Sequence, residues 1–254
     1  KIIAMLAALL LAIGSVPGAI GEASRFKATF LDVFDTYSEI IVYAQDEATA
    51  QQILTNAHTD LLAYHQLFDI YNNYDGINNL KTVNDNAGVQ PVAVDARLID
   101  LLTFAKDLQP KLNGRINIAM GSVLRIWHTY REAGINDPSS AQLPPMADLQ
   151  AAAQHTDMQN LVINRDAGTV YLTDTAMSLD VGAVAKGYAV ERVAQDMIAA
   201  GVTSALLSIG GNVRAIGTRG DGTAWRVNVQ NPDLTAQDQG LTTLNLADLS
   251  LVTS

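Results

Sequence analysis

Hydrophobic residues recur at the helical period along much of the chain. Between residues 46 and 69 an apolar residue follows every three or four positions, and Asp46 stands where a helix N-cap is expected. A second helix is predicted after Asp95, and two more on either side of the sequence INDPSSAQLPP. Residues 70–88 are crowded with Asn, Asp and Gly, so we expect a structured loop or a chain of turns there.

Strand patterns flank these helices. Residues 30–44 are rich in β-branched and aromatic side chains and predict one or two strands. Later segments with the same character are LVINRDAGTVYL, SALLSIGG, VRAIG, WRVNVQ, LTTLNL and LSLVTS. Among them, a helix is predicted from Ala183 to Ala200, ended by Gly201. Hairpins and helices without regular βαβ alternation predict an α+β fold with antiparallel sheets and packed helices.

Composition narrows the classes of function. The 254 residues are 48% hydrophobic, enough for a substantial core, and carry a formal net charge of −10. Lys and Arg are scattered singly, so nucleic acid is not an expected partner. The chain has no cysteine, which excludes disulfides, thiolate catalysis and Cys-ligated metals for this sequence.

The N-terminus has the order of a secretory signal. Lys1 precedes the apolar run IIAMLAALLLAIG, and small residues follow. We therefore expect residues 1–24 to be a signal peptide or N-terminal anchor, and the protein to be exported, periplasmic or at the cell surface. The alternative is a buried N-terminal helix. Because the chain begins at Lys and stops at Ser254 within an expected strand, we expect residues 25–254 to be a C-terminally truncated domain.

The common catalytic templates are missing from this sequence. It contains no P-loop, no GxGxxG after a strand, no GxSxG and no HxxxH pair. The dispersed histidines, each expected to be a surface or half-buried polar residue, are His58, His65, His128 and His155. A histidine-based zinc enzyme is therefore disfavoured.

The segment SLDVGAVAKGYAVERV is the strongest candidate for chemistry. Asp180 precedes the predicted helix, so its carboxylate could simply be an N-cap. Alternatively, the free amides of the helix start, left accessible by small residues, could hold a ligand phosphate. Lys186, one turn further on, could reach that ligand or could be a solvated surface residue.

Two further segments are weaker candidates. In LLSIGGNVRAIG, Gly210 and Gly211 permit close backbone approach, although a simple hairpin turn explains them equally well. In NGRINIAMGSVLRIW, glycines flank an apolar run that leads to Trp127, which we expect to be part of the core.

Together, in this order, the three segments resemble the FAD:protein FMN transferases of the ApbE family. SLDVGAVAKGYAVERV resembles that family's Asp-(x)5-Lys-Gly-Tyr-Ala block, IGGNVRAIG with WRVNVQNP its Gly-Gly block and following strand, and GRINIAMGSVLRIW its Gly-rich stretch. The resemblance covers about residues 30–254. It implies an ApbE-like fold of tandem T-fold-like lobes.

The resemblance also implies an activity and its partners. Members of the family transfer FMN from FAD to a Thr or Ser hydroxyl of a partner protein, such as a membrane redox-complex subunit, with Mg²⁺ bound and AMP released. Two rivals stay open. One is a FAD-binding protein or FAD pyrophosphatase without a protein acceptor, and the other is an exported binding protein without catalytic activity.

Site residues follow from the same resemblance. Asp180 becomes the candidate catalytic residue, with a positioning role first and a general-base role second, and the carbonyl of Ala183 a magnesium ligand. The residues implied to contact FAD are Phe34, Tyr71, Arg115, Ile116, Asn117, Asp180 and Lys186. Asn117 stands where many members have Asp, and Phe34 where Met is common. The remaining metal ligands are expected past Ser254.

Overall fold

A five-stranded antiparallel sheet is the largest sheet of the protein. The structure is a computed structural model that describes residues 23–233 and 235–253. The sheet contains β1 (Ser24–Phe30), β2 (Ser38–Ala44), β6 (Ala205–Ile209), β7 (Asn212–Ile216) and β10 (Ser250–Val252), in the order β1-β2-β6-β7-β10. Strands from the two ends of the chain thus lie side by side, and β2 and β6 pair from Ser38–Ile209 to Val42–Ala205.

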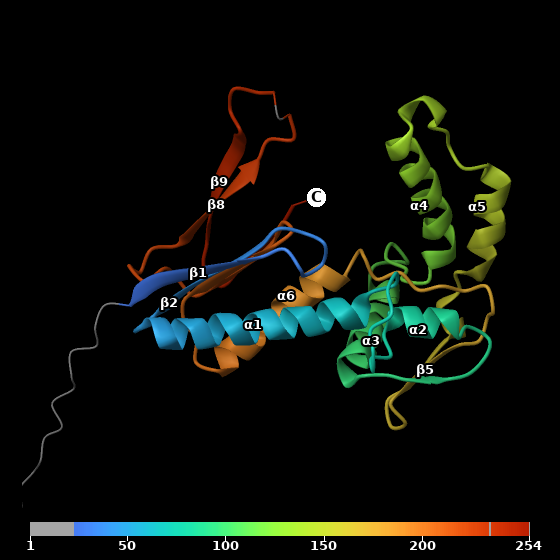
Figure 1. The fold of residues 1–254 in the computed structure, drawn as a ribbon, viewed down its shortest axis with the longest axis horizontal. Helices are drawn as coiled ribbons and strands as arrows, with labels where there is room; N and C mark the ends of the chain where they lie inside the picture. The colour runs from blue at the N-terminus through green and yellow to red at the C-terminus, as the bar shows by residue number, and fades with distance from the viewer. Residues whose placement is uncertain (1–22, 234, 254) are drawn as a thin grey trace, which may run out of the picture.

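Two long helices cover one face of this sheet. Helices α1 (Glu47–Phe68) and α6 (Ala185–Ala199) lie together under the strands (Figure 1). Asp46 caps α1 by accepting a hydrogen bond from the Thr49 amide at 2.8 Å, as the sequence predicted. Leu61 of α1 and Val193 of α6 are both 0% exposed in the main core. Burial of such side chains contributes about 1.5–3 kcal/mol each, so the packing of α1 and α6 against the sheet stabilises the fold substantially.

A second region follows α1 and carries the remaining helices. Its sheet has the order β3-β5-β4, from β3 (Val92–Ala93), β4 (Leu161–Asn164) and β5 (Thr169–Leu172). Its helices are α2 (Leu80–Asp85), α3 (Ala96–Lys111), α4 (Gly121–Asn136) and α5 (Met146–Ala152), with short 3₁₀ turns at Pro138–Ser140, Ala153–His155 and Met158–Asn160. Figure 1 shows α4 and α5 standing out from the body of the molecule.

A two-stranded ribbon completes the described part. Strands β8 (Trp225–Gln230) and β9 (Gly240–Leu246) pair antiparallel, and Figure 1 shows the end of this hairpin projecting from the main sheet. Trp225, 4% exposed, anchors its base in a small cluster with Ile41 and Ala215.

The structure confirms the α+β class with antiparallel sheets and packed helices. Two expectations were wrong in detail. Residues 70–88 are not all turns, because α2 forms at Leu80 with Asn79 and Thr82 as a capping box. Helix α6 begins at Ala185 and not at Ala183, because residues 181–184 form a turn before it.

The predicted N-terminal signal or anchor lies outside the described residues except for Ala23 and Ser24, so it stays a prediction, as does the domain assignment of 25–254. Among the described helices, none combines the length and apolar character needed to cross a membrane.

Candidate functional site

A pocket of about 240 Å³ lies where the ends of three elements meet. The turn between β1 and β2 supplies Phe34, the loop after α1 supplies Tyr71, and the segment leading into α6 supplies Asp180 and Lys186. These are four of the residues proposed from the sequence, and they come from positions up to 152 apart, since 186 − 34 = 152.

Asp180 is held by its backbone and by one side-chain contact. Its amide donates to the carbonyl of Ile118 at 2.8 Å, and its Oδ1 accepts from the amide of Gly182 at 2.8 Å. No other described residue contacts the carboxylate through a hydrogen bond or ion pair, so Oδ2 is available to a ligand. Of the two alternatives for Asp180, the N-cap is wrong: Asp180 closes a turn ahead of the helix, and the cap position belongs to Val184, which makes no side-chain cap bond.

The segment before Asp180 is fixed by a side chain distant in sequence. Asn84 of α2 donates from Nδ2 to the Leu179 carbonyl at 2.9 Å, and its Oδ1 accepts a hydrogen bond from the Leu179 amide at 2.8 Å. The amide of Gly121 donates to the Ser178 carbonyl at 3.0 Å. A Cβ on Gly121 would lie 2.5 Å from that oxygen, so the approach requires glycine. Asp180 is therefore placed by α2 and α4 as well as by α6.

The start of α6 exposes backbone. Gly182, Ala183 and Gly187 are exposed, and a Cβ on Gly187 would meet no atom closer than 3.4 Å. Within the described residues, the amides of Lys186 and Gly187 have no hydrogen-bond acceptor. Free amides at the start of a 15-residue helix present positive potential to an anion. The bare backbone expected at Ala183 is thus accessible.

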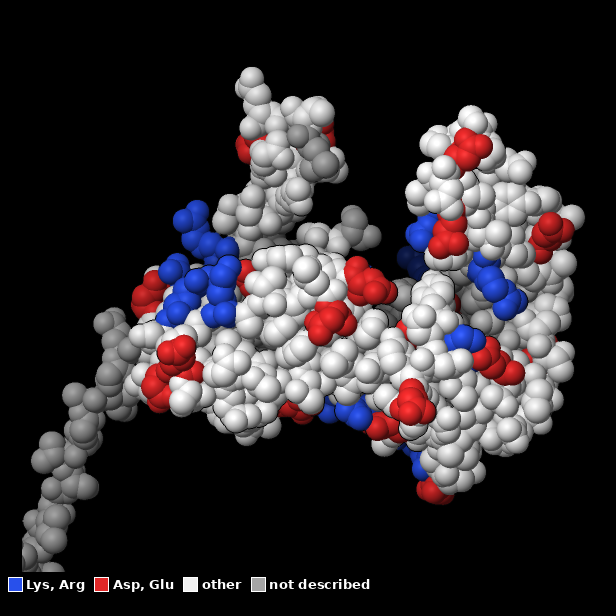
Figure 2. Space-filling view, viewed as in Figure 1, with Lys and Arg blue, Asp and Glu red and all other residues white. Residues whose placement is uncertain are grey.

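Charges around the pocket are mostly negative. Asp35, Asp69 and Asp180 line it, and Lys186 and the half-buried His65 are the basic side chains among its lining residues. In the described part of the chain, Lys186 has no ion-pair or hydrogen-bond partner. Figure 2 shows acidic side chains at the end of the main sheet that faces α4 and α5. An anionic ligand therefore needs Lys186, the free amides or an added cation to be stable here.

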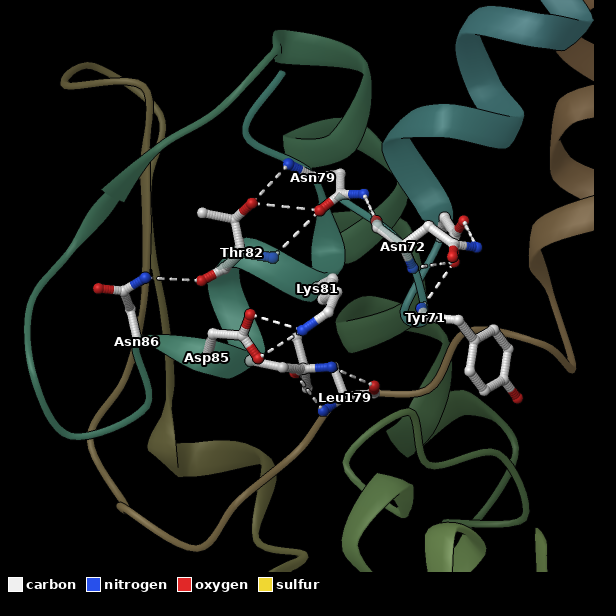
Figure 3. Close-up of polar contacts among 10 residues, drawn as sticks. Tyr71, Asn72, Asn79, Lys81, Thr82, Asp85, Asn86 and Leu179 are labelled. Atoms are coloured by element: carbon white, nitrogen blue, oxygen red, sulfur yellow. Dashed lines mark hydrogen bonds and ion pairs between the residues drawn. The ribbon is translucent and has the colours of Figure 1, made fainter. Parts of the chain in front are cut away.

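Tyr71 separates the pocket from a larger groove. The groove, about 940 Å³, shares Ile70, Tyr71 and Asp180 with the pocket and continues along α4. The amide of Tyr71 donates to Asp69 at 2.6 Å, while its ring, 58% exposed, extends away from the loop (Figure 3). The ring lies 5.4 Å from that of His128 on α4, so Tyr71 offers an aromatic face between the two cavities.

Trp127 lines this groove and is 42% exposed. The expectation that it belongs to the core is wrong, because α4 buries only its first turn, at Gly121, Ser122 and Val123. The four histidines are half-buried, as expected.

Three of the proposed FAD contacts lie outside the pocket. Arg115 is exposed, and neither it nor Ile116 lines the pocket or the groove. Asn117 is half-buried, where its side chain accepts the Ala119 amide at 2.9 Å and donates to the Thr156 carbonyl at 2.9 Å. Asn117 thus supports the turn whose Ile118 carbonyl accepts the Asp180 amide.

The Gly-Gly segment forms the hairpin turn between β6 and β7, with φ of +52° at Gly210 and +83° at Gly211. Asn212 and Arg214, the polar residues that follow this turn, are buried in β7, and Arg214 pairs with Glu191 at 2.8 Å. A Cβ at Gly210 would meet Thr36 at 2.7 Å, so this hairpin supports the turn that carries Phe34.

The donor set at Ala183 fits a magnesium ion held mainly by phosphate. The exposed Ala183 carbonyl accepts no hydrogen bond from the described residues and is free to bind a cation. No cluster of three or more His, Asp or Glu side chains in the described ranges could hold a metal ion. Magnesium takes oxygen ligands and usually keeps several waters and substrate phosphates in its shell, so a site with few protein ligands is compatible with this ion.

The sequence did not reveal several parts of this site. The Asn84–Leu179 pair joins positions 95 apart and leaves no local pattern. His65 lies in the last turn of α1 and Asp69, four residues later, is the residue that ends the helix; that spacing was the available signal.

An α+β scaffold with an anion-accepting helix start beside an exposed aromatic ring is typical of a nucleotide-binding protein. The family model described as "ApbE family" matches residues 34–254, and the chain belongs to that family.

Curated relatives carry one name. A FAD:protein FMN transferase of Treponema pallidum is 28% identical over 99% of this chain and 70% of its own length, and one of Klebsiella pneumoniae is 28% identical over 84% of this chain and 61% of its own. The chain thus spans about two thirds of the length of these relatives.

Solved structures share the fold. The ApbE protein of Thermotoga maritima superposes with a TM-score of 0.73 at 20% identity, covering 89% of this chain and 69% of that one. The flavin transferase ApbE of Vibrio cholerae gives 0.72 at 19% identity, covering 90% and 70%.

Proposed function

We propose that this protein transfers the FMN half of FAD to a Thr or Ser hydroxyl of a partner protein and releases AMP. The observation that carries the proposal is the 240 Å³ pocket, which joins Phe34, Tyr71, Asp180 and Lys186 beside an exposed helix start. Family membership and the names of the relatives support it.

Different residues of the pocket bind different parts of the dinucleotide. The ammonium of Lys186 and the free amides of Lys186 and Gly187 bind phosphate oxygens. Tyr71 and Phe34 provide aromatic surface for a flat ring. The free Oδ2 of Asp180 accepts hydrogen bonds from the ribose or base, which avoids repulsion between its carboxylate and the diphosphate.

The transfer needs no covalent intermediate on the protein, so the main task of the site is to position FAD and the acceptor hydroxyl. The acceptor oxygen forms a bond to the FMN-side phosphorus, the phosphorus–oxygen bond to AMP breaks, and the hydroxyl proton leaves with solvent or through Asp180. Mg²⁺ bound at the Ala183 carbonyl would neutralise charge on the phosphoryl oxygens during this exchange. The groove along α4 meets the pocket at Asp180 and provides an approach for the acceptor.

The cellular setting is part of the proposal. The apolar N-terminal segment supports export, and a membrane redox-complex subunit is the acceptor that the family resemblance favours.

The test is to incubate the protein with FAD, Mg²⁺ and a family acceptor domain. The expected products are AMP and an acceptor heavier by one FMN, measured by chromatography and mass spectrometry, with the acceptor's Thr→Val variant unmodified. AMP and FMN formed equally without acceptor would indicate a pyrophosphatase instead. FAD binding without turnover would indicate a binding protein.

A further inference from the structure

A chain of hydrogen bonds joins the two aromatic walls of the pocket. The Phe34 amide donates to Nδ1 of His65 at 3.1 Å, and Nε2 of His65 lies 3.2 Å from the Tyr74 hydroxyl. Tyr74 donates to Asp69 at 2.7 Å, and Asp69 accepts the Tyr71 amide at 2.6 Å. His65, in the last turn of α1, is therefore the link between Phe34 and Tyr71.

The direction of this chain fixes the tautomer of His65. A backbone amide can only donate, so Nδ1 carries no proton, and a neutral imidazole then carries its proton on Nε2. Nε2 donates a hydrogen bond to the Tyr74 oxygen, and the Tyr74 hydroxyl donates a hydrogen bond to Asp69. His65 and Tyr74 each accept one hydrogen bond and donate one, so the chain requires that Nδ1 of His65 carries no proton.

The Phe34 end of the chain is strained. Phe34 and Asp35 have φ of +54° and +50°, a left-handed conformation that is unfavourable for residues other than glycine. The turn's own bond, from the Thr36 amide to the Val33 carbonyl, is long at 3.4 Å. Among the described residues His65 is the acceptor for the Phe34 amide, and their rings also pack edge to face at 5.7 Å.

At the other end of the chain, Asp69 is held by hydrogen bonds from the Tyr71 amide, Tyr74 and Asn72. Burial alone would raise the pKa of Asp69, but hydrogen bonds from the Tyr71 amide, Tyr74 and Asn72 outweigh it and lower that pKa. Burial and the bond to Asp69 raise the pKa of Tyr74 to about 12. Neither group changes protonation near neutral pH, whereas imidazoles as a class titrate between pH 5 and 8.

We propose that neutral His65 is a positioning residue that holds Phe34 and Tyr71 at the pocket, so that protonation of its Nδ1 releases the Phe34 turn and weakens FAD binding. This inference rests on the proposed binding of FAD at this pocket. The ionisable groups that face His65 are Asp32 and Asp35 of the β1–β2 turn, Asp69 and Tyr74 after α1, and Asp180 and Lys186 before and within α6.

The experiment measures the dissociation constant of FAD by flavin fluorescence from pH 8 to pH 5. The wild-type protein is expected to bind about threefold to tenfold more weakly at pH 5, the effect of one lost hydrogen bond. His65→Leu is expected to bind about threefold to tenfold more weakly at every pH, with no change between pH 8 and pH 5.

His65→Asn is the informative rescue. Its Oδ1 occupies the position of Nδ1, accepts the Phe34 amide and does not titrate, so near-wild-type affinity with a flat profile is expected. His58→Asn on the same helix is the matched control, because His58 pairs with Asp32 and does not line the pocket. It is expected to keep the wild-type affinity and its loss at pH 5. If His65→Leu does not fold, Tyr74→Phe, which breaks the next link, is expected to weaken binding about threefold.

The assignment would be overturned if His65→Leu bound FAD with wild-type affinity and an unchanged pH profile. If His65→Leu does not fold, the same result in Tyr74→Phe would overturn it. Loss of the acid effect in His58→Asn would also overturn it. Absence of FAD binding by the wild-type protein would refute the proposed function and the assignment with it. The two failures are therefore distinct.

Discussion

Asn84→Ala tests how the site is held together. The side chain makes bonds of 2.8 and 2.9 Å to the amide and carbonyl of Leu179, a residue that is 0% exposed. Alanine leaves both backbone groups buried without a partner, and each such group costs about 1–3 kcal/mol. With partial relaxation, we expect a loss of about 2–4 kcal/mol in the free energy of unfolding and weaker FAD binding, because Asp180 follows directly.

Urea denaturation followed by tryptophan fluorescence measures the stability, and flavin fluorescence measures the binding. Asn84→Asp keeps an acceptor for the Leu179 amide but sets a carboxylate against the carbonyl, so it is expected to be unstable at pH 7 and to recover partly at pH 4. Asn56→Ala, on the exposed face of α1, is the control. A loss below about 0.5 kcal/mol in Asn84→Ala, with unchanged FAD affinity, would refute the reasoning.

Three other predictions concern single positions. Gly121→Ala places a Cβ 2.5 Å from the Ser178 carbonyl and is expected to cost about 1–3 kcal/mol in urea denaturation; stability equal to wild type would contradict the close approach. Lys186→Ala is expected to weaken FAD binding by about 1–3 kcal/mol in titration calorimetry. An unchanged dissociation constant would show that Lys186 is a solvated residue that does not contact FAD. The pKa of Asp69 is lowered in the folded state, so its carboxylate stabilises the fold above about pH 4 and loses this effect as the pH falls further. The difference in unfolding free energy between wild type and Asp69→Asn is therefore expected to shrink below about pH 4. A difference that stays constant with pH would contradict this role of Asp69.

Local patterns in the sequence were enough to predict the long helices. Asp46 and Asp95 cap α1 and α3 where the sequence placed them, because an N-cap and its helix are neighbours in the chain. The short helix α2 was missed because its Asn-rich surroundings favour turns, although Asn79 and Thr82 carried the capping-box signal.

Parts of the site that depend on tertiary contacts could not be predicted. Helical periodicity shows that Trp127 lies on an apolar face of α4 but not whether another element covers that face. The contact between Asn84 and Leu179 depends on how α2 packs, and the turn at Phe34 on the hairpin behind it. Asp180 and Lys186 could be proposed from the sequence because their spacing is local, whereas the residues that support this segment come from elsewhere in the chain.

The central claim is that the exposed backbone at the start of α6 accepts a diphosphate and its cation. The most direct measurement is a crystal structure of the protein with FAD and Mg²⁺. We predict the diphosphate beside the carbonyl of Ala183, within hydrogen-bond distance of Lys186 and the Gly187 amide, and aromatic contact with Tyr71. A dinucleotide bound elsewhere, with protein side chains filling the space at Ala183, would contradict it.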